Sequence, residues 1–170
     1  MKEKFSKRVQ AIIKQSKEEA IELGHSYVGS EHILLGLLKV NSGKGKKILD
    51  IFNININEMI NSINTRIKTS GGTLNLGHLP LTRRAERILR NSYNEASSRG
   101  DSISDDIHLL LAMLKEPEGI ASRVLKSFSL DYETVSELIF SDDGSFLVEE
   151  IAGDKNIKTK KILKFESAFV

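Results

Sequence analysis

Hydrophobic residues recur at every third or fourth position along most of the chain, the spacing of a helix, with polar residues between them. The pattern predicts an amphipathic helix from Ser6 to Leu23, with Gly24 as a residue suited to end it. A more apolar helix follows, from Ser30 to Lys39, and it needs another helical layer packed over it. Six further helices are predicted over residues 43–52, 56–67, 82–99, 105–115, 119–128 and 131–140.

The chain also repeats itself. An ungapped offset of 76 positions places Phe5 on Leu81, Gly24 on Gly100, His32 on His108, Gly43 on Gly119 and Ile63 on Ile139. Such a long match indicates a tandem duplication. We therefore predict an all-α fold of two four-helix repeats related by pseudo-twofold symmetry. In the domain 1–140, repeat one covers 5–64, a connector 65–80 and repeat two 81–140, and residues 141–170 form a linker or a small β-element.

Composition excludes several classes of protein. The 170 residues are 39% hydrophobic and 28% charged with a net charge of +2, a balance too even for a dedicated nucleic-acid binder. Cysteine is absent, so no disulfide or thiolate metal site is expected. The charged N-terminus does not resemble a signal peptide, and no apolar run is long enough to cross a membrane. We expect a cytoplasmic protein that contacts neither nucleic acid nor membrane.

The segment from Gly24 to Leu37 carries a specific resemblance. It reads G-H-S-Y-V-G-S-E-H-I-L-L-G-L and resembles the G-H…G-T-E-H-I-L-L-G-L signature in the N-terminal domain of Clp ATPases of the ClpC and ClpA type. The resemblance covers roughly residues 3 to 140. It implies a domain that sits on a hexameric AAA+ unfoldase, recruits adaptor and substrate proteins, and passes them to the ATPase ring and the ClpP protease. The isolated domain is expected to be a monomer.

Residues for chemistry are not evident. The stretch Gly43-Lys44-Gly45-Lys46-Lys47 has neither the spacing nor the Ser/Thr of a phosphate-binding loop. We therefore expect no ATP hydrolysis by this polypeptide, no catalytic residue and no cofactor. The three lysines of this stretch, Lys44, Lys46 and Lys47, either contact an acidic partner or form a solvated helix face.

Five residues are candidates for binding a partner or a phosphorylated arginine: Arg8, Ser30, Glu31, Arg84 and Asp106. The resemblance associates Glu31 with the guanidinium of phosphoarginine, and a carboxylate does pair with that planar cation through two parallel hydrogen bonds. Backbone N–H groups at a helix start suit the phosphate. Alternatively, Ser30 is only an N-cap and Glu31 only complements the helix dipole. The second repeat departs here, because Asp106 matches Ser30 and Ile107 matches Glu31.

Other charged and titratable residues have simpler interpretations. His32 and His108 are the histidine pair kept in repeat register, and we expect packed, hydrogen-bonded side chains and no zinc site. His25 and His78 fall in predicted loops without a pattern. Partners are expected in the groove between the repeats, or across the exposed faces of the first and fifth helices. Arg8, Arg84, Glu18, Glu19 and Glu95 would then be rim charges that steer association.

Three functions remain open at this point. The first is the adaptor- and substrate-docking domain of a Clp unfoldase, and the second is a stand-alone Clp-repeat protein that binds and regulates the protease. A phosphate-loop ATPase encoded downstream favours the first, and a stop codon after Val170 favours the second. The third is a small hydrolase or metal enzyme, which requires turnover or stoichiometric zinc in the purified protein.

Overall fold

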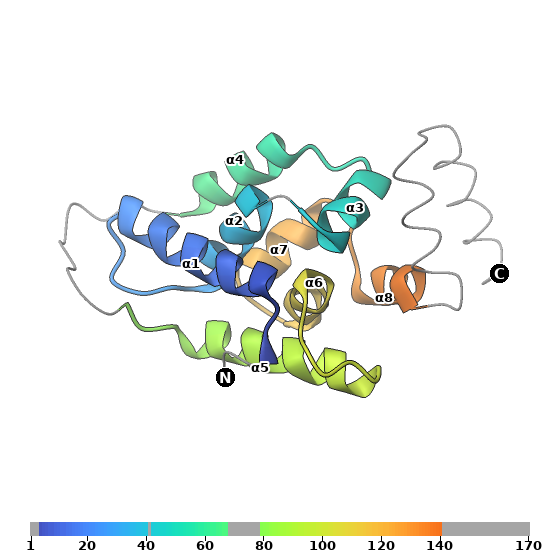
Figure 1. Ribbon diagram of the computed structural model, residues 1–170. Helices are drawn as coiled ribbons and strands as arrows, with labels where there is room; N and C mark the ends of the chain where they lie inside the picture. The colour runs from blue at the N-terminus through green and yellow to red at the C-terminus, as the bar shows by residue number, and fades with distance from the viewer. Residues whose placement is uncertain (1–3, 41, 68–78, 141–170) are drawn as a thin grey trace.

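The computed structural model describes residues 4–40, 42–67 and 79–140, and these fold into eight α-helices without a β-strand (Figure 1). The all-α prediction is confirmed. The proposed linker or β-element at 141–170 and most of the 65–80 connector lie outside the described residues. The helices are α1 (Lys7–Glu22), α2 (Ser30–Val40), α3 (Lys44–Ile51), α4 (Ile56–Arg66), α5 (Arg83–Ser98), α6 (Asp106–Lys115), α7 (Ile120–Ser127) and α8 (Tyr132–Phe140).

Side-chain caps set most of the helix starts. The hydroxyls of Ser6 and Thr82 accept hydrogen bonds from backbone N–H groups in the first turns of α1 and α5, and Asp131 does the same for α8. The prediction that Ser30 caps α2 is wrong by one residue. The carbonyl of Gly29 accepts the first intrahelical bond, from the Ile33 N–H at 3.2 Å, so Ser30 is already inside the helix.

Two short backbone pairings join the repeats, and they are equivalent to each other under the repeat offset. Phe5 pairs with Ser104, and Val28 pairs with Leu81. The offset of 76 carries Phe5 onto Leu81 and Val28 onto Ser104, so the first pairing becomes the second. Reciprocal contacts of this kind are the signature of twofold symmetry. The segment before α1 therefore lies beside the loop before α6, and the segment before α5 lies beside the loop before α2.

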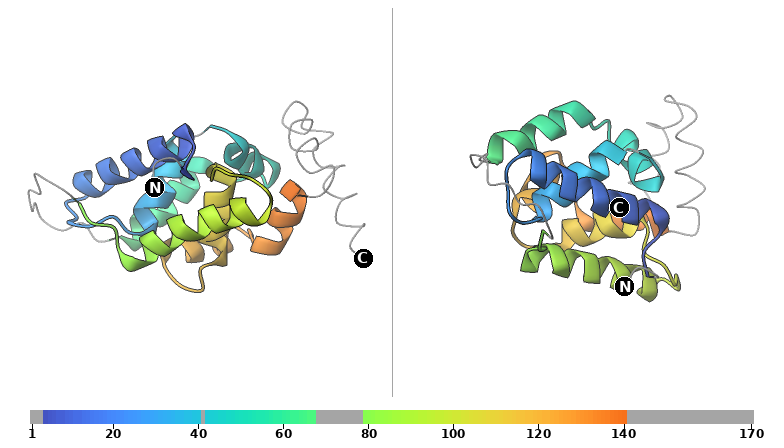
Figure 2. Two further views of the ribbon diagram at one scale, coloured as in Figure 1. Left: turned by 60° about the horizontal axis from the view of Figure 1, so that its bottom comes forward. Right: turned by 60° about the vertical axis from the view of Figure 1, so that its left-hand side comes forward.

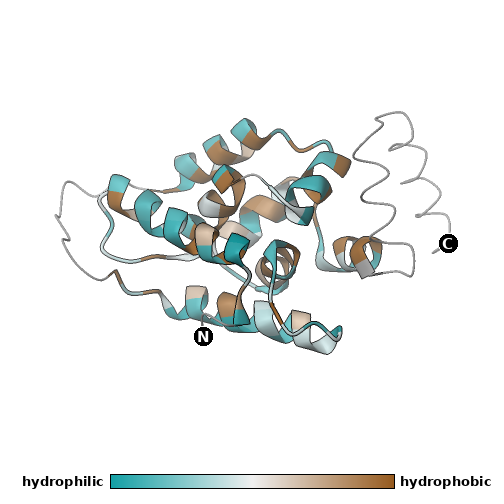
Figure 3. Ribbon diagram, in the orientation of Figure 1, coloured by the Kyte–Doolittle hydropathy of each residue, from teal (hydrophilic) through white to brown (hydrophobic). Residues whose placement is uncertain are grey.

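The two equivalent helices α2 and α6 form the centre of the molecule. Nearly every residue of both is buried, and α1 packs on α2 as α5 packs on α6. Figure 3 shows α6 end on, with brown apolar residues around it. Helix α5 runs along the bottom of the molecule in Figure 1, and α1 lies above it there and in both views of Figure 2. The helical layer predicted over residues 30–39 is thus present.

An ion pair between a buried glutamate and a solvent-exposed lysine repeats in the two halves. Glu19 on α1 accepts from Lys39 on α2 at 2.6 Å, and Glu95 on α5 lies 3.6 Å from Lys115 on α6. Glu19 and Glu95 are only 5% and 6% exposed, so the expectation that they are rim charges is wrong. Their positions on amphipathic helices suggested side chains exposed to solvent. In the structure, each carboxylate instead pairs with a lysine of the neighbouring helix.

Gly36 allows α1 and α2 to approach closely. A Cβ added there would lie 2.6 Å from both the Ile12 carbonyl oxygen and the Ser16 hydroxyl. We expect Gly36→Ala to lower the free energy of unfolding by about 1–3 kcal/mol, since backbone on the facing helix cannot move aside cheaply. Urea denaturation measures this. Asn64→Ala, on the exposed side of α4, is the control and should leave stability nearly unchanged. An equally stable Gly36→Ala variant would contradict the close packing.

Candidate functional site

The backbone pairings create two equivalent pockets where helix starts meet. The first pocket, with a volume of about 430 Å³, lies between the starts of α2 and α5. The second pocket, about 280 Å³, lies beside the starts of α1 and α6. The first is lined by Tyr27, Gly29, Ser30, Glu31, Thr82, Arg83, Arg84 and Arg87. The second is lined by Ser6, Lys44, Asp101, Ser102, Ile103, Asp105, Ile107 and His108.

The first pocket combines one carboxylate with three guanidinium groups. Glu31 faces it from the first turn of α2, and Arg83, Arg84 and Arg87 face it from the first turns of α5. The Glu31 carboxylate folds back over Gly29, where an added Cβ would lie 2.5 Å from its Oε1 atom. Such a pocket offers a carboxylate for a cation and guanidinium groups for an anion, side by side.

The arginines of the first pocket are held to different degrees. Arg87 makes a two-pronged contact with Glu116, with nitrogen–oxygen distances of 2.6 and 2.9 Å. These bonds hold the pKa of the Glu116 carboxyl below its usual value. Arg84 lies 3.7 Å from Glu116 and 3.7 Å from Glu118, which is outside hydrogen-bond range. Arg84 is therefore held electrostatically but not locked.

A pair of histidines forms the wall behind the first pocket. The Gly29 N–H donates to His32 Nδ1 at 2.9 Å, and His32 Nε2 lies 2.8 Å from His25 Nδ1. Because His32 Nδ1 accepts, the proton sits on Nε2 and points to His25. Burial and the neighbouring His25 lower the pKa of His32 to about 4, so it is neutral at pH 7. The prediction of packed, hydrogen-bonded histidines is confirmed for His32, and its partner His25 was missed.

His108 repeats this arrangement in the second repeat. Its Nδ1 atom accepts from the Asp105 N–H at 2.9 Å, and its Nε2 atom lies 3.3 Å from Asp101. Asp101 thus takes the place that His25 has in repeat one. No group of three or more His, Asp or Glu side chains suited to a metal ion occurs within the ranges 4–40, 42–67 and 79–140.

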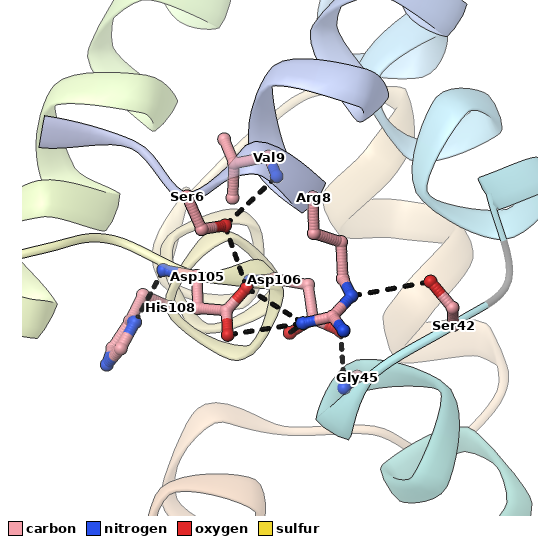
Figure 4. Close-up of polar contacts among 8 residues, drawn as sticks. All are labelled: Ser6, Arg8, Val9, Ser42, Gly45, Asp105, Asp106 and His108. Atoms are coloured by element: carbon pink, nitrogen blue, oxygen red, sulfur yellow. Dashed lines mark hydrogen bonds and ion pairs between the residues drawn. The ribbon is translucent and has the colours of Figure 1, made fainter. Parts of the chain in front are cut away.

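Next to the second pocket, the equivalent residues Arg8 and Asp106 make contacts within the chain (Figure 4). Arg8 donates to both carboxylate oxygens of Asp105, at 3.2 and 3.3 Å. Asp106 is buried, with 1% of the residue exposed. Its Oδ2 atom accepts a hydrogen bond from the Gly45 N–H at 2.7 Å. Its Oδ1 atom has no hydrogen-bond partner and lies 3.9 Å from Arg8.

The two adjacent aspartates titrate in opposite directions. Burial raises the pKa of the Asp106 carboxyl to about 6, although the Gly45 N–H and Arg8 oppose the shift. Burial also acts on Asp105. There, however, hydrogen bonds from the Asp106 N–H, the Ser6 hydroxyl and Arg8 prevail, and its pKa lies below the usual value.

A third feature is a groove between α1 and α5, which we call the interhelical groove. Its volume is about 720 Å³. Apolar side chains from both repeats line it, and three lysines of α1 stand along one side. The apolar lining includes Phe5, Ala11, Ile13, Leu79, Pro80, Leu81 and Leu89, and the lysines are Lys7, Lys14 and Lys17.

The structure divides the five residues predicted from sequence between two places. Ser30, Glu31 and Arg84 line the first pocket, whereas Arg8 and Asp106 lie together beside the second. Sequence reasoning missed Arg83 and Arg87. Their signal was available, because three arginines at positions 83, 84 and 87 fall within one turn at the start of a helix. Of the lysine run, Lys46 pairs with Asp50 and Lys44 lines the second pocket.

None of the described helices has the length and apolar character required to cross a bilayer.

Comparison with known proteins gives one consistent result. The sequence matches the family described as "Clp repeat (R) N-terminal domain" over residues 4–128 and again over 81–150. The chloroplastic chaperone protein ClpC1 of Oryza sativa subsp. japonica is 37% identical over 131 residues. That match takes in 77% of this chain but only 14% of ClpC1, so the chain spans about a seventh of such relatives.

Solved structures share the fold at low sequence identity. The Hsp104 N-terminal domain from Candida albicans has a TM-score of 0.68 at 17% identity, covering 84% of this chain and 93% of that one. Another structure is described as "Peptide from EAEC T6SS Sci1 SciI protein". It has a TM-score of 0.65 at 16% identity and covers 79% of this chain and 86% of that one. With a family match over most of its length, this chain belongs to the Clp repeat N-terminal domain family.

Proposed function

We propose that this chain is the docking domain of a Clp-type protein unfoldase, which binds adaptor and substrate proteins and performs no chemistry itself. The interhelical groove carries the proposal. It is open, mostly apolar and shared by both repeats, as a surface that accepts side chains of another polypeptide must be. The description of one solved neighbour names a peptide, which is in keeping with such a role. The ATPase ring, its hexameric state and delivery to ClpP belong to the same proposal.

The occupant that fits this groove is a segment with apolar and acidic side chains. Ile13, Pro80 and Leu81 offer accessible apolar surface. Positive charge along the side comes from Lys7, Lys14 and Lys17. The single acidic residue of the lining, Glu86, leaves the groove net positive. Charges at the rim set the preferred partner and the association rate, while the apolar floor supplies most of the affinity.

The first pocket is proposed as a second, chemically distinct site for a phosphorylated arginine on a substrate. Glu31 would pair with the guanidinium, and Arg84 with the phosphate. The Ser30 hydroxyl would complete the anion contacts, because it lies close to the start of α7, 3.3 Å from a Cβ built at Gly119. A site that offers both a carboxylate and a guanidinium would bind phosphoarginine in preference to arginine or phosphate alone.

The groove is tested by filling it. Ala11 is exposed on α1 and lines the groove, so Ala11→Arg places a large side chain in it without disturbing the core. Two synthetic peptides share the same leucines and phenylalanines, spaced by glutamates in one and by lysines in the other. We expect the parent to prefer the glutamate peptide, and Ala11→Arg to weaken its binding by about tenfold or more, measured by fluorescence anisotropy.

The matched control is Asn94→Arg, which adds the same charge to the exposed face of α5 outside the groove. It should bind as the parent does. Unchanged binding by Ala11→Arg would remove the groove as the docking site, and a preference for the lysine peptide would remove the acidic partner.

The first pocket is tested with free phosphoarginine followed by amide NMR. We expect shifts at Gly29, Ser30 and Arg84 in the parent. Glu31→Gln keeps the shape and removes the charge, so affinity should fall by about tenfold, as for the loss of a hydrogen bond to a charged group. Glu58→Gln removes an exposed carboxylate on α4, outside the pocket, and serves as control. A parent spectrum unaffected by millimolar phosphoarginine would rule the site out.

A further inference from the structure

The two pockets occupy equivalent positions in the duplicated fold, yet their anion-binding corners differ. In the first pocket, Ser30 and Arg84 belong to the lining, although Ser30 itself is only 3% exposed. The offset of 76 carries Ser30 onto Asp106 and Arg84 onto Arg8. Neither Asp106 nor Arg8 lines the second pocket, because each already contacts groups of this chain.

The Asp106 carboxylate occupies the place where an anion would bind at the start of α3. Its Oδ2 atom accepts from the Gly45 N–H at 2.7 Å, and its Oδ1 atom lies 3.9 Å from Arg8. A backbone N–H at a helix start and a nearby guanidinium are the groups that would receive a phosphate oxygen. The Oδ1 atom of Asp106 is buried without a hydrogen-bond partner, so the anion at this corner has capacity to accept a further hydrogen bond.

Glycine on the facing helix makes room for this carboxylate. A Cβ added at Gly45 would lie 2.8 Å from Asp106 Oδ2, and one at Gly43 would lie 2.7 Å from the same atom. In the first repeat's pocket, Ala121 stands at the position equivalent to Gly45, and Ser30 stands at the position equivalent to Asp106. The residues of each pair are thus complementary in size. The larger side chain, Asp106, is paired with Gly45, and the smaller, Ser30, is paired with Ala121.

The charges of the two pocket linings also favour an anion in the first pocket over the second. Asp101 and Asp105 line the second pocket with Lys44 as its one Lys or Arg, whereas three arginines and a single glutamate line the first. Ile107 replaces Glu31, so the position equivalent to Glu31 carries no carboxylate in the second pocket. An incoming anion would meet two carboxylates before it reached Arg8.

We infer that Asp106 is a built-in anion that fills the second of two equivalent anion sites, so that the domain binds one phosphorylated group per chain, in the first pocket. The comparison between pockets rests on the function proposed for the first. The assignment of Asp106 to the α3 corner stands on its own contacts. Asp106 is accordingly a residue that sets binding stoichiometry and does not itself contact a ligand.

The test uses Asp106→Ser and Asp106→Asn with inorganic phosphate as probe, followed at the Gly45 amide by NMR. Asp106→Ser copies the first pocket and should open the corner, giving saturable shifts at Gly45 on phosphate addition. Asp106→Asn keeps an oxygen that accepts from the Gly45 N–H, so it should stay closed, as should the parent. Both variants remove a buried charge, and retained amide dispersion shows that each is folded.

A pH titration of the Gly45 amide provides the second readout. Asp105 and Arg8 are the charged groups that face Asp106, and Asp105 is already ionised at mildly acidic pH. In the parent, the Gly45 shift should follow the Asp106 carboxyl, whose pKa is raised to about 6, and this titration should vanish in Asp106→Asn.

The inference fails if folded Asp106→Ser shows no phosphate-dependent shift at Gly45, or if the parent already shows one. It also fails if the parent Gly45 shift does not titrate. These outcomes are independent of the first pocket. A parent that ignores phosphoarginine at Ser30 and Arg84 removes the proposed phosphoarginine site alone, and leaves the result at Gly45 to decide the role of Asp106.

Discussion

The reciprocal pairing of Phe5 with Ser104 and Val28 with Leu81 is the constraint on which the arrangement depends. Each pairing ties the segment before an outer helix to the loop before a central helix of the other repeat. The hydrogen bonds repeat as well: Ser6 N–H donates to the Ser104 carbonyl, and Thr82 N–H donates to the Val28 carbonyl, both at 2.9 Å. As a result, two helix starts from different repeats meet at each pocket, and positive ends of helix dipoles gather there.

Duplication has preserved the internal contacts and changed the pocket surfaces. The ion pairs of Glu19 and Glu95 and the rings of His32 and His108 recur because each satisfies buried polar groups. At the pockets, by contrast, the equivalent positions differ: Glu31 is partly exposed, whereas Ile107 is buried and belongs to the hydrophobic core. The two halves of a symmetric fold therefore present different pocket linings.

The helices and their pairing could be predicted from the sequence, because apolar spacing and an ungapped repeat report on burial directly. The roles of charged residues could not. Glu19 follows the charged residues Lys17 and Glu18 in sequence, and its contact with Lys39 on another helix could not be read from the sequence. Likewise, Asp106 and Glu31 are both acidic residues near a helix start. Their difference depends on Gly45, which is 61 positions away from Asp106. Ser30 was misplaced as a cap because Gly29 is the residue that precedes the helix, and the Gly29 N–H donates to the ring of His32, three residues after Gly29.

The ion pairs around the first pocket indicate which arginine would receive a phosphate. Arg87 would have to give up two short bonds to Glu116 before it could bind anything else. Arg84 lies 3.7 Å from Glu116 and from Glu118, and Glu118 is largely exposed, so this contact is weak in water. Exchanging it for a phosphate oxygen therefore costs little. Glu116, kept ionised by Arg87, meanwhile holds Arg84 near the pocket without occupying it. The pocket is thus preorganised by one arginine and open at the other, which is the arrangement that an exchangeable anionic ligand requires.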